Sequence, residues 1–212
     1  MDVPEPEFLA QLKQRLNRAA EPGELLAAVQ ELSAYGDQPE VIPLLIGVLG
    51  YNNPRVAQVA MGGLLRAGRR AVPELLQRLD GYNYGARAYA IRVLAQIGDP
   101  RALAVLEEAA RADFAPSVRR AALRGLGSMV WDSLPQPEAA QTQVLQTLEA
   151  VSRDGDWGIR YAVIVAVELW WQSGNVPAPL RPRLDALLQH FTQDSDPVVQ
   201  ARAQFSLHRR DK

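Results

Sequence analysis

The 212-residue chain contains no cysteine. This absence excludes disulfide bonds, thiolate metal ligands, a cysteine nucleophile and any thioether that the chain itself would hold permanently. Histidine is scarce as well, because the chain has only His190 and His208, and neither has a second ligand at the spacing of a metal site. We therefore expect no metal centre.

The chain also lacks a large net charge and a long apolar run. The 23 Lys and Arg residues nearly balance 24 Asp and Glu residues, so the composition does not favour binding to nucleic acid or to an anionic membrane. The longest apolar run, 161–167, is far shorter than the roughly 20 residues of a membrane span. The first eight residues are acidic and proline-containing, unlike a secretory signal. We expect a cytoplasmic protein without a membrane span.

Common catalytic motifs are absent from the sequence. It has no phosphate-binding GxxxxGK[ST] loop, no dinucleotide-binding GxGxxG motif and no GxSxG nucleophile elbow. Catalytic residues therefore stay unassigned, and the sequence chemistry favours binding over bond-making. Any catalysis is expected to depend on holding reactants in position.

A short phrase recurs six times along the chain. It consists of a turn residue, an apolar residue two places on, a small residue four further and a leucine-like residue four after that. The turn residues are Pro22, Pro54, Tyr84, Pro116, Trp157 and Pro197, and the first copy lacks the first apolar residue. Successive copies begin 32, 30, 32, 41 and 40 residues apart. Periods of this size indicate a repeat array, in which each unit buries its apolar face against its neighbours.

The phrase predicts a stack of helical hairpins. Each turn residue is expected to open the second helix of a hairpin. The first helices are expected near 7–19, 38–50, 70–80, 100–111, 138–152 and 180–192. Gly36, Gly68 and Gly98 follow three of the second helices and are expected to form left-handed C-terminal caps. The predicted fold is all-α, a right-handed α-α superhelix of about six helical hairpins forming one domain over 1–212.

One expected helix, 157–171, is apolar in almost every direction, because Arg160 and Glu168 are its only charged residues. Such a helix needs cover on more than one side. Two interpretations remain open. Either the inserts at 133–137 and 172–179 fold over it, or it belongs to an interface with another protein.

Arginine recurs at two sets of positions in the expected second helices. Opposite the core, Tyr89 and Arg92 share a helix face with Gly85 and Gln96, and the aligned arginines elsewhere are Arg55, Arg66, Arg124, Arg202 and Arg209. This set predicts a basic stripe in a concave trough, suited to carboxylates or phosphates. A solvated helix face is the alternative. The second set, Arg87, Arg119 and Arg160, is expected to form a structural ladder with acidic turn residues such as Asp156.

Aromatic residues cluster in or beside the second helices, mostly near their ends. The cluster consists of Tyr82, Tyr84, Tyr89, Trp131 and Trp157. Together they are expected to form a wall for a flat conjugated ligand. Ordinary packing is the alternative for each of them.

Two segments carry a family resemblance: NYGARAYAIRVLAQIGDPRAL at 83–103 and DFAPSVRRAALRGLG at 113–127. They resemble the HEAT-like repeats of phycobilisome lyases, and more narrowly the F-type (beta) subunit of the heterodimeric E/F phycocyanobilin lyases. The resemblance implies an E-type partner subunit and the attachment of phycocyanobilin, as substrate and without a cofactor, to a cysteine of the phycocyanin alpha subunit. The acceptor thiol would be the nucleophile. The absence of cysteine argues against the isomerising members of the family.

The resemblance also implies roles for the residues singled out above. Arginines would hold the two propionates of the bilin, aromatic rings would contact its pyrroles, and Asp113 would face the pyrrole nitrogens. The implied substrate-binding residues are Tyr82, Tyr84, Arg87, Tyr89, Arg92, Asp113, Arg124, Trp131, Trp157 and Arg160. The competing function is a non-enzymatic HEAT-repeat scaffold or chaperone that acts in phycobiliprotein assembly or degradation.

Overall fold

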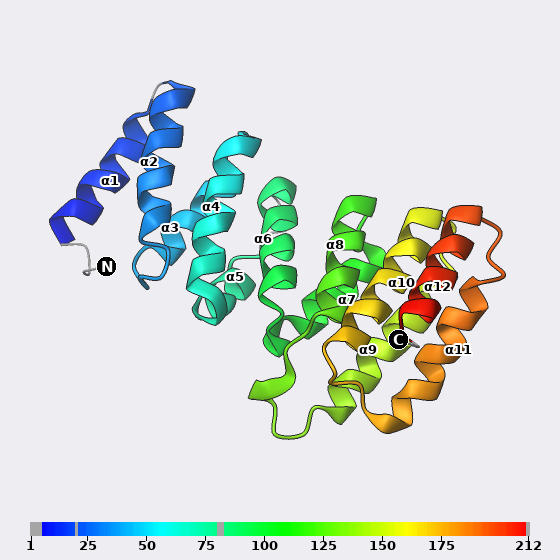
Figure 1. Ribbon diagram of the computed structural model, residues 1–212. Helices are drawn as coiled ribbons and strands as arrows, with labels where there is room; N and C mark the ends of the chain where they lie inside the picture. The colour runs from blue at the N-terminus through cyan, green and yellow to red at the C-terminus, as the bar shows by residue number, and fades with distance from the viewer. Residues whose placement is uncertain (1–5, 20, 80–82, 211–212) are drawn as a thin grey trace. The chain divides into compact units, whose positions relative to one another are not determined.

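Helices are the only regular elements in the described part of the chain. A computed structural model describes residues 6–19, 21–79 and 83–210, and these ranges contain helices and no strand (Figure 1). This result confirms the predicted all-α class. None of the helices in these ranges is long and apolar enough to cross a membrane.

The chain divides into two compact units, Met1–Ile97 and Gly98–Lys212. The first unit contains α1 Pro6–Arg18, α2 Pro22–Ala34, α3 Ile42–Val48, α4 Pro54–Ala67, α5 Val72–Gln77 and α6 Tyr84–Ile97, with a 3₁₀ turn at Gly68–Arg70. The second contains α7 Leu103–Ala112, α8 Pro116–Gly127, α9 Glu138–Val151, α10 Trp157–Gln172, α11 Arg181–Phe191 and α12 Pro197–Arg210, with 3₁₀ turns at Pro100–Ala102, Trp131–Ser133 and Ala178–Leu180. A single domain over 1–212 therefore stays a prediction.

Every predicted turn residue opens a second helix, as the repeat phrase requires. The helices α2, α4, α6, α8, α10 and α12 begin at these residues. Proline fits there because its missing N–H group would have no partner in the first turn. Asx side chains reinforce four of the starts, those of α4, α6, α10 and α12. Asn53 accepts a hydrogen bond from the Val56 N–H group at 3.3 Å, and Asp156 accepts one from Gly158 at 2.7 Å.

Within each unit the second helices stack in series, and first helices pack against them. In the first unit α4 contacts α2, α3 and α6, and in the second unit α10 contacts α8 and α12 (Figure 1). The apolar positions of the repeat phrase form the core. Val56, Leu64, Val118 and Val163 are all at most 1% exposed.

The glycine caps are confirmed at two of three positions. Gly68 and Gly98 have φ values of 57° and 66°, in the left-handed region that favours glycine. The prediction for Gly36 is wrong, because its φ is not positive. A Cβ atom at Gly36 would lie 2.2 Å from the Gly63 carbonyl oxygen. Glycine at position 36 therefore lets the end of α2 approach the backbone of α4.

The apolar helix α10 is covered mainly by other helices of its own unit. It packs against α8, α9, α11 and α12, and Ile159, Val163 and Val167 are fully buried. These neighbours provide the cover on several sides that its composition requires. At the start of the helix, Trp157 remains 50% exposed.

Candidate functional site

In the first unit, two of the predicted site residues of α6, Tyr89 and Arg92, form a guanidinium–ring pair. The Arg92 guanidinium carbon lies 5.5 Å from the centroid of the Tyr89 ring. Both side chains are half-buried, as is Tyr84 at the start of the helix. A cation held over an aromatic face presents hydrogen-bond donors beside a flat apolar surface. This arrangement is able to bind a carboxylate attached to a conjugated ring.

Asn83 fixes the start of α6 and hence the position of the Arg92–Tyr89 pair. Its side chain accepts a hydrogen bond from the Ala86 N–H group at 3.0 Å and donates one to the Gly50 carbonyl oxygen at 3.3 Å. Arg87 is half-buried on the same helix. The predicted residue Tyr82 lies outside the described residues.

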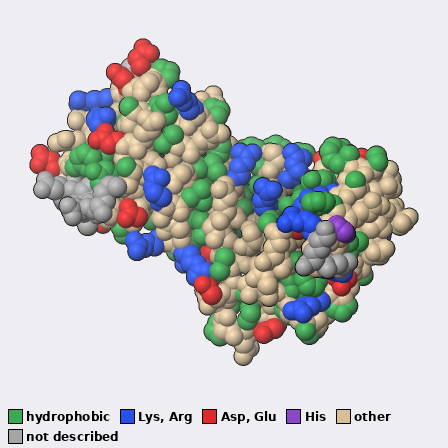
Figure 2. Space-filling view, viewed as in Figure 1, with side chains coloured by type: hydrophobic (Ala, Val, Ile, Leu, Met, Phe, Trp, Pro, Cys, Tyr) green, Lys and Arg blue, Asp and Glu red, His purple; other side chains and the backbone are tan. Residues whose placement is uncertain are grey.

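In the second unit, the predicted site residues are not equally accessible. Arg124 is exposed on α8 and Trp157 is half exposed at the start of α10. Trp131 is only 5% exposed, and its indole N–H group has no hydrogen-bond partner among the described residues. Trp157 therefore presents its ring to solvent, whereas Trp131 packs in the interior. Figure 2 shows Lys and Arg side chains gathered with hydrophobic ones over α8, α10 and α12.

The predicted arginine ladder is present in the second unit. Arg119 pairs with Asp154 at 2.5 Å, and Arg160 pairs with Asp194 through two hydrogen bonds of 2.8 and 2.7 Å. The acidic partners are thus Asp154 and Asp194, whereas Asp156, which the sequence suggested, caps α10. The third guanidinium nitrogen of Arg160, Nη1, donates to the Asp154 carbonyl oxygen at 2.9 Å. For Arg160 to bind a ligand carboxylate, its ion pair with Asp194 would have to open.

Both ladder carboxylates have a pKa below the ordinary value for aspartate. For Asp194 the main cause is the Arg160 guanidinium, which outweighs the effect of burial. For Asp154 burial alone would raise the pKa, but hydrogen bonds from the Asp156 backbone and from Arg119 together lower it. Both carboxylates are therefore more acidic in the folded chain than in the unfolded chain.

Asp113 occupies the same turn position as the two ladder aspartates. Its carboxylate accepts a hydrogen bond from the N–H group of Ala115 at 2.9 Å, and Asp154 and Asp194 bind the residue two places on at 2.9 and 2.8 Å. The Asp113 residue is 9% exposed. It is thus one of a repeated set of turn residues, and its contact with pyrrole nitrogens stays a prediction.

Several arginines of the expected basic stripe bind groups of the protein itself. Arg66 donates to the backbone and hydroxyl oxygens of Ser33. Arg202 and Arg209 both pair with Glu168, which is 8% exposed. Glu168 was not singled out from the sequence as a binding residue, although it interrupts an otherwise apolar helix face. The surface charge of α10 and α12 is consequently lower than the number of arginines suggests.

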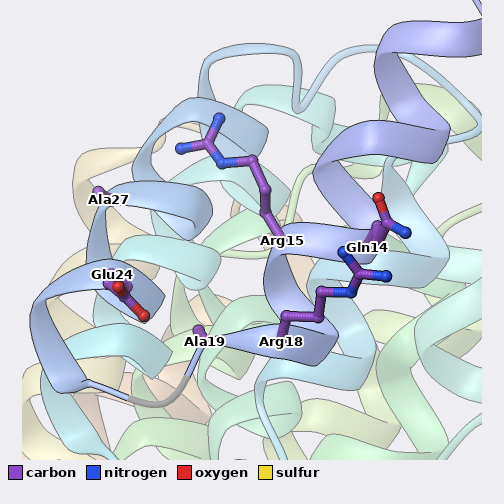
Figure 3. A pocket seen from close by; sticks show the side chains of 6 residues that line it. All are labelled: Gln14, Arg15, Arg18, Ala19, Glu24 and Ala27. Atoms are coloured by element: carbon purple, nitrogen blue, oxygen red, sulfur yellow. The ribbon is translucent and has the colours of Figure 1, made fainter.

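A pocket of about 460 Å³ lies between α1 and α2 in the first unit. Figure 3 shows Arg15 and Arg18 on α1 and Glu24 on α2 around it, and Arg15 pairs with Glu31 at 2.5 Å. None of the predicted site residues lines this pocket. Within the described ranges, no group of three or more His, Asp and Glu side chains is arranged to hold a metal ion.

Comparison with known proteins identifies relatives over most of the chain. A family model of HEAT repeats matches residues 52–127, 72–168 and 108–208. The phycocyanobilin lyase subunit beta of Nostoc sp. (strain PCC 7120) is 48% identical over 183 residues, which are 85% of this chain and 90% of the relative. The phycocyanin alpha phycocyanobilin lyase CpcF of Synechocystis sp. (strain PCC 6803) is 44% identical over 208 residues, covering 97% and 94% of the two chains.

Solved structures agree with these relatives. A chain in the complex of CpcE and CpcF of phycocyanin lyase from Nostoc sp. PCC7120 is 45% identical, with a TM-score of 0.74, covering 80% of this chain and 99% of that one. A designed armadillo repeat protein in complex with the peptide (KR)4 has a TM-score of 0.57 at 19% identity, covers 94% of this chain and 98% of its own, and supports the fold alone. The resemblance found in the sequence is confirmed, and the chain belongs to the HEAT-repeat family of phycocyanobilin lyase beta subunits.

Proposed function

We propose that this chain is one subunit of a heterodimeric phycocyanobilin lyase, which binds phycocyanobilin and attaches it to a cysteine of the phycocyanin alpha subunit in the cytoplasm. The observation that carries the proposal is similarity along almost the whole chain to a protein named phycocyanin alpha phycocyanobilin lyase. The partner is an E-type subunit, since a related chain was solved in the complex of CpcE and CpcF.

The chemistry of attachment fits a chain that has no cysteine. The thiol of the acceptor protein adds across the ethylidene double bond of the bilin, so that a C–S bond forms and the bilin gains the proton. This addition needs no oxidant, reductant or cofactor. Phycocyanobilin is therefore a substrate, and a lyase without thiols releases it to the acceptor.

The contribution of the chain is to position the pigment. A guanidinium group donates two parallel hydrogen bonds to a propionate, and an aromatic ring stacks on a pyrrole. Each unit has groups suited to these roles: the first has the Arg92–Tyr89 pair, and the second has the exposed Arg124 and Trp157. Fixing one extended conformer would select the face of the bilin that the thiolate attacks and increase the rate.

Coexpression tests the proposal directly. The chain is produced together with an E-type subunit, the apo-phycocyanin alpha subunit and a bilin source, and each component is left out in turn. We expect a covalent, correctly coloured alpha subunit only when all components are present. Equal yield without this chain, with all other components folded, would exclude its role in attachment.

A scaffold without pigment chemistry is distinguished by absorbance. Free phycocyanobilin is mixed with the purified chain, alone and with its E-type partner. A lyase is expected to shift and sharpen the absorption band, because binding selects an extended conformer of the bilin. A scaffold leaves the spectrum unchanged.

A further inference from the structure

Four positions of each second helix share one helix face, the face of the basic stripe expected from the sequence. Counted from the turn residue, they are the second, sixth, ninth and thirteenth residues, and their spacings of four, three and four follow the helical period. We call them the stripe positions. On α12 they hold Val198, Arg202, Phe205 and Arg209.

The stripe positions of three adjacent helices in the second unit differ in chemistry. The helix α10 contacts both α8 and α12 (Figure 1). Its stripe positions hold only glycine and apolar residues, and the last two, Val165 and Leu169, are half-buried. The ninth residue of α8 is the exposed Arg124, and the ninth residue of α12 is Phe205, which is 49% exposed. An apolar strip on α10 is thus bordered by a cation on α8 and by an aromatic ring on α12.

The Phe205 ring is held between two guanidinium groups. The guanidinium carbons of Arg202 and Arg209 lie 5.5 and 5.6 Å from the centroid of the ring. Both arginines pair with Glu168, whose side chain is 9% exposed. We call Glu168, Arg202, Phe205 and Arg209 the α12 cluster. Two guanidinium groups against one carboxylate leave this cluster with a positive charge, and the buried carboxylate holds both cations beside the ring.

Arg209 is the cation of the α12 cluster that a ligand reaches most easily. Its side chain is 56% exposed, whereas that of Arg202 is 21% exposed. Within the described part of the chain its one hydrogen bond runs from Nη1 to Glu168 at 3.2 Å. Its other N–H groups are therefore able to bind a second carboxylate. The α12 cluster offers a stacking surface next to a donor of charge-assisted hydrogen bonds.

The first unit carries the same pairing of a ring and a guanidinium at equivalent helical positions. Tyr89 and Arg92 are the sixth and ninth residues of α6. On α12 the sixth and ninth residues are Arg202 and Phe205, so the two residue types have exchanged places. The guanidinium carbon lies 5.5 Å from the ring centroid in both pairs. The repeat phrase uses the third, seventh and eleventh positions for the core, so recurrence at the sixth and ninth favours binding over packing.

We propose that the α12 cluster binds one propionate-bearing pyrrole of phycocyanobilin, with Arg209 on the propionate and Phe205 stacked on the ring. Glu168 is a positioning residue, because it acts on the pigment only through the two arginines. This inference rests on the proposed function and adds two residues that contact the substrate. It is supported by the match between a flat conjugated ligand with two ionised propionates and a positive cluster built around a half-exposed ring.

The contact of Arg209 is tested by comparing phycocyanobilin with its dimethyl ester, in which both propionates are blocked. Each is titrated into the heterodimer and followed by absorbance. In Arg209→Gln we expect the dissociation constant of the free pigment to rise about tenfold, the size of a lost charge-assisted hydrogen bond. That of the ester should change by less than about twofold, because the ester has no carboxylate for Arg209 to bind. Arg153→Gln removes an exposed arginine of the turn after α9 and is the matched control.

The aromatic ring is tested by Phe205→Leu, which keeps an apolar side chain at the site. We expect the dissociation constants of the pigment and of its ester to rise by the same factor, about fivefold, since stacking does not involve the propionates. Phe114→Leu is the control, because Phe114 is 77% exposed in the turn before α8 and lies off the stripe positions. Far-UV circular dichroism and thermal melting establish that all variants fold.

Three results would overturn the placement of the pigment on the α12 cluster. The first is wild-type affinity for phycocyanobilin in either variant. The second is an equal loss of affinity for pigment and ester in Arg209→Gln, which would mean that Arg209 acts on the fold. The third is normal pigment affinity with weakened binding of the apo-phycocyanin alpha subunit, which would assign the cluster to the acceptor protein. A wild-type heterodimer that binds no phycocyanobilin would contradict the proposed function itself.

Discussion

Among single residues, the ladder arginines are expected to stabilise the fold. Replacing Arg160 by Met would leave the Asp194 carboxylate, whose side chain is only 7% exposed, without its ion pair. We expect a loss of about 3 kcal/mol in the free energy of unfolding, measured by chemical denaturation. The control Arg153→Met removes an exposed arginine of the turn after α9. It should change the free energy of unfolding by less than about 0.5 kcal/mol. If Arg160→Met lowered the free energy of unfolding as little as the control does, the stabilising role of the ladder would be contradicted.

The lowered pKa of Asp154 and Asp194 predicts how stability depends on pH. Above about pH 5 both carboxylates are ionised in the folded and unfolded chain, so their contribution is complete. As the pH falls, the unfolded chain takes up protons first and the folded chain loses stability. Chemical denaturation at several pH values between 3 and 7 should show that the free energy of unfolding falls with decreasing pH. For Arg160→Met this free energy should fall less steeply. Equal slopes would contradict the assigned role of Arg160.

Arg92 is expected to act on the pigment and to contribute little to folding. Arg92→Ala removes the guanidinium beside Tyr89, and we expect bilin affinity of the heterodimer to fall by about tenfold or more, the size of a lost charge-assisted hydrogen bond. Absorbance titration with phycocyanobilin measures this change. Arg78→Ala, which removes an exposed arginine after α5, is the control. Normal titration of Arg92→Ala would remove Arg92 from the site.

Residue roles were only partly predictable from the sequence. The regular spacing of Arg119 and Arg160 identified a ladder, but Asp154 and Asp156 occupy one turn, and only geometry shows which of them the arginine reaches. The recurrence of aspartate at 113, 154 and 194 was the available signal. The burial of Trp131 was not predictable, because an aromatic residue near a helix end suits a ligand wall and a core equally well.

At the scale of elements, two adjacent glycines of α4 test how closely the helices pack. A Cβ atom at Gly62 meets no atom within 4 Å, whereas one at Gly63 would lie 2.6 Å from Leu45 and 2.8 Å from the Ser33 hydroxyl. We expect Gly62→Ala to stabilise the chain by about 0.5–1 kcal/mol through helix propensity. Gly63→Ala should destabilise it by about 1–3 kcal/mol. Equal thermal shifts for both variants would contradict the close contact of α2, α3 and α4.

Element starts were the most predictable part of the fold. A proline or aromatic turn residue fixes the beginning of each second helix, and all six starts are where the repeat phrase places them. The first helices were less well predicted, since α3 and α5 are shorter than expected. Pro43 and Pro73 each occupy the second residue of their helix, where proline marks a helix start, and this signal would have moved both boundaries.

For the whole molecule, the repeat register determines which surfaces are covered and which remain for partners. The contacts of Glu168 with Arg202 and Arg209 join residues 34 and 41 places apart. The sequence predicted the stack, but not these pairs, because side chains on neighbouring helices meet only once the helices are placed. The family likewise identifies a lyase subunit, whereas the groups that hold the pigment are assigned from local geometry.

The most direct test of the central claim is the initial rate of bilin attachment by purified components. Phycocyanobilin and the apo-phycocyanin alpha subunit are mixed with the E-type subunit, with and without this chain, and covalent adduct is followed by absorbance and by mass. We expect one adduct at one cysteine to form at least about a hundredfold faster with this chain present. An unchanged rate and the same mixture of adducts in both reactions would contradict it.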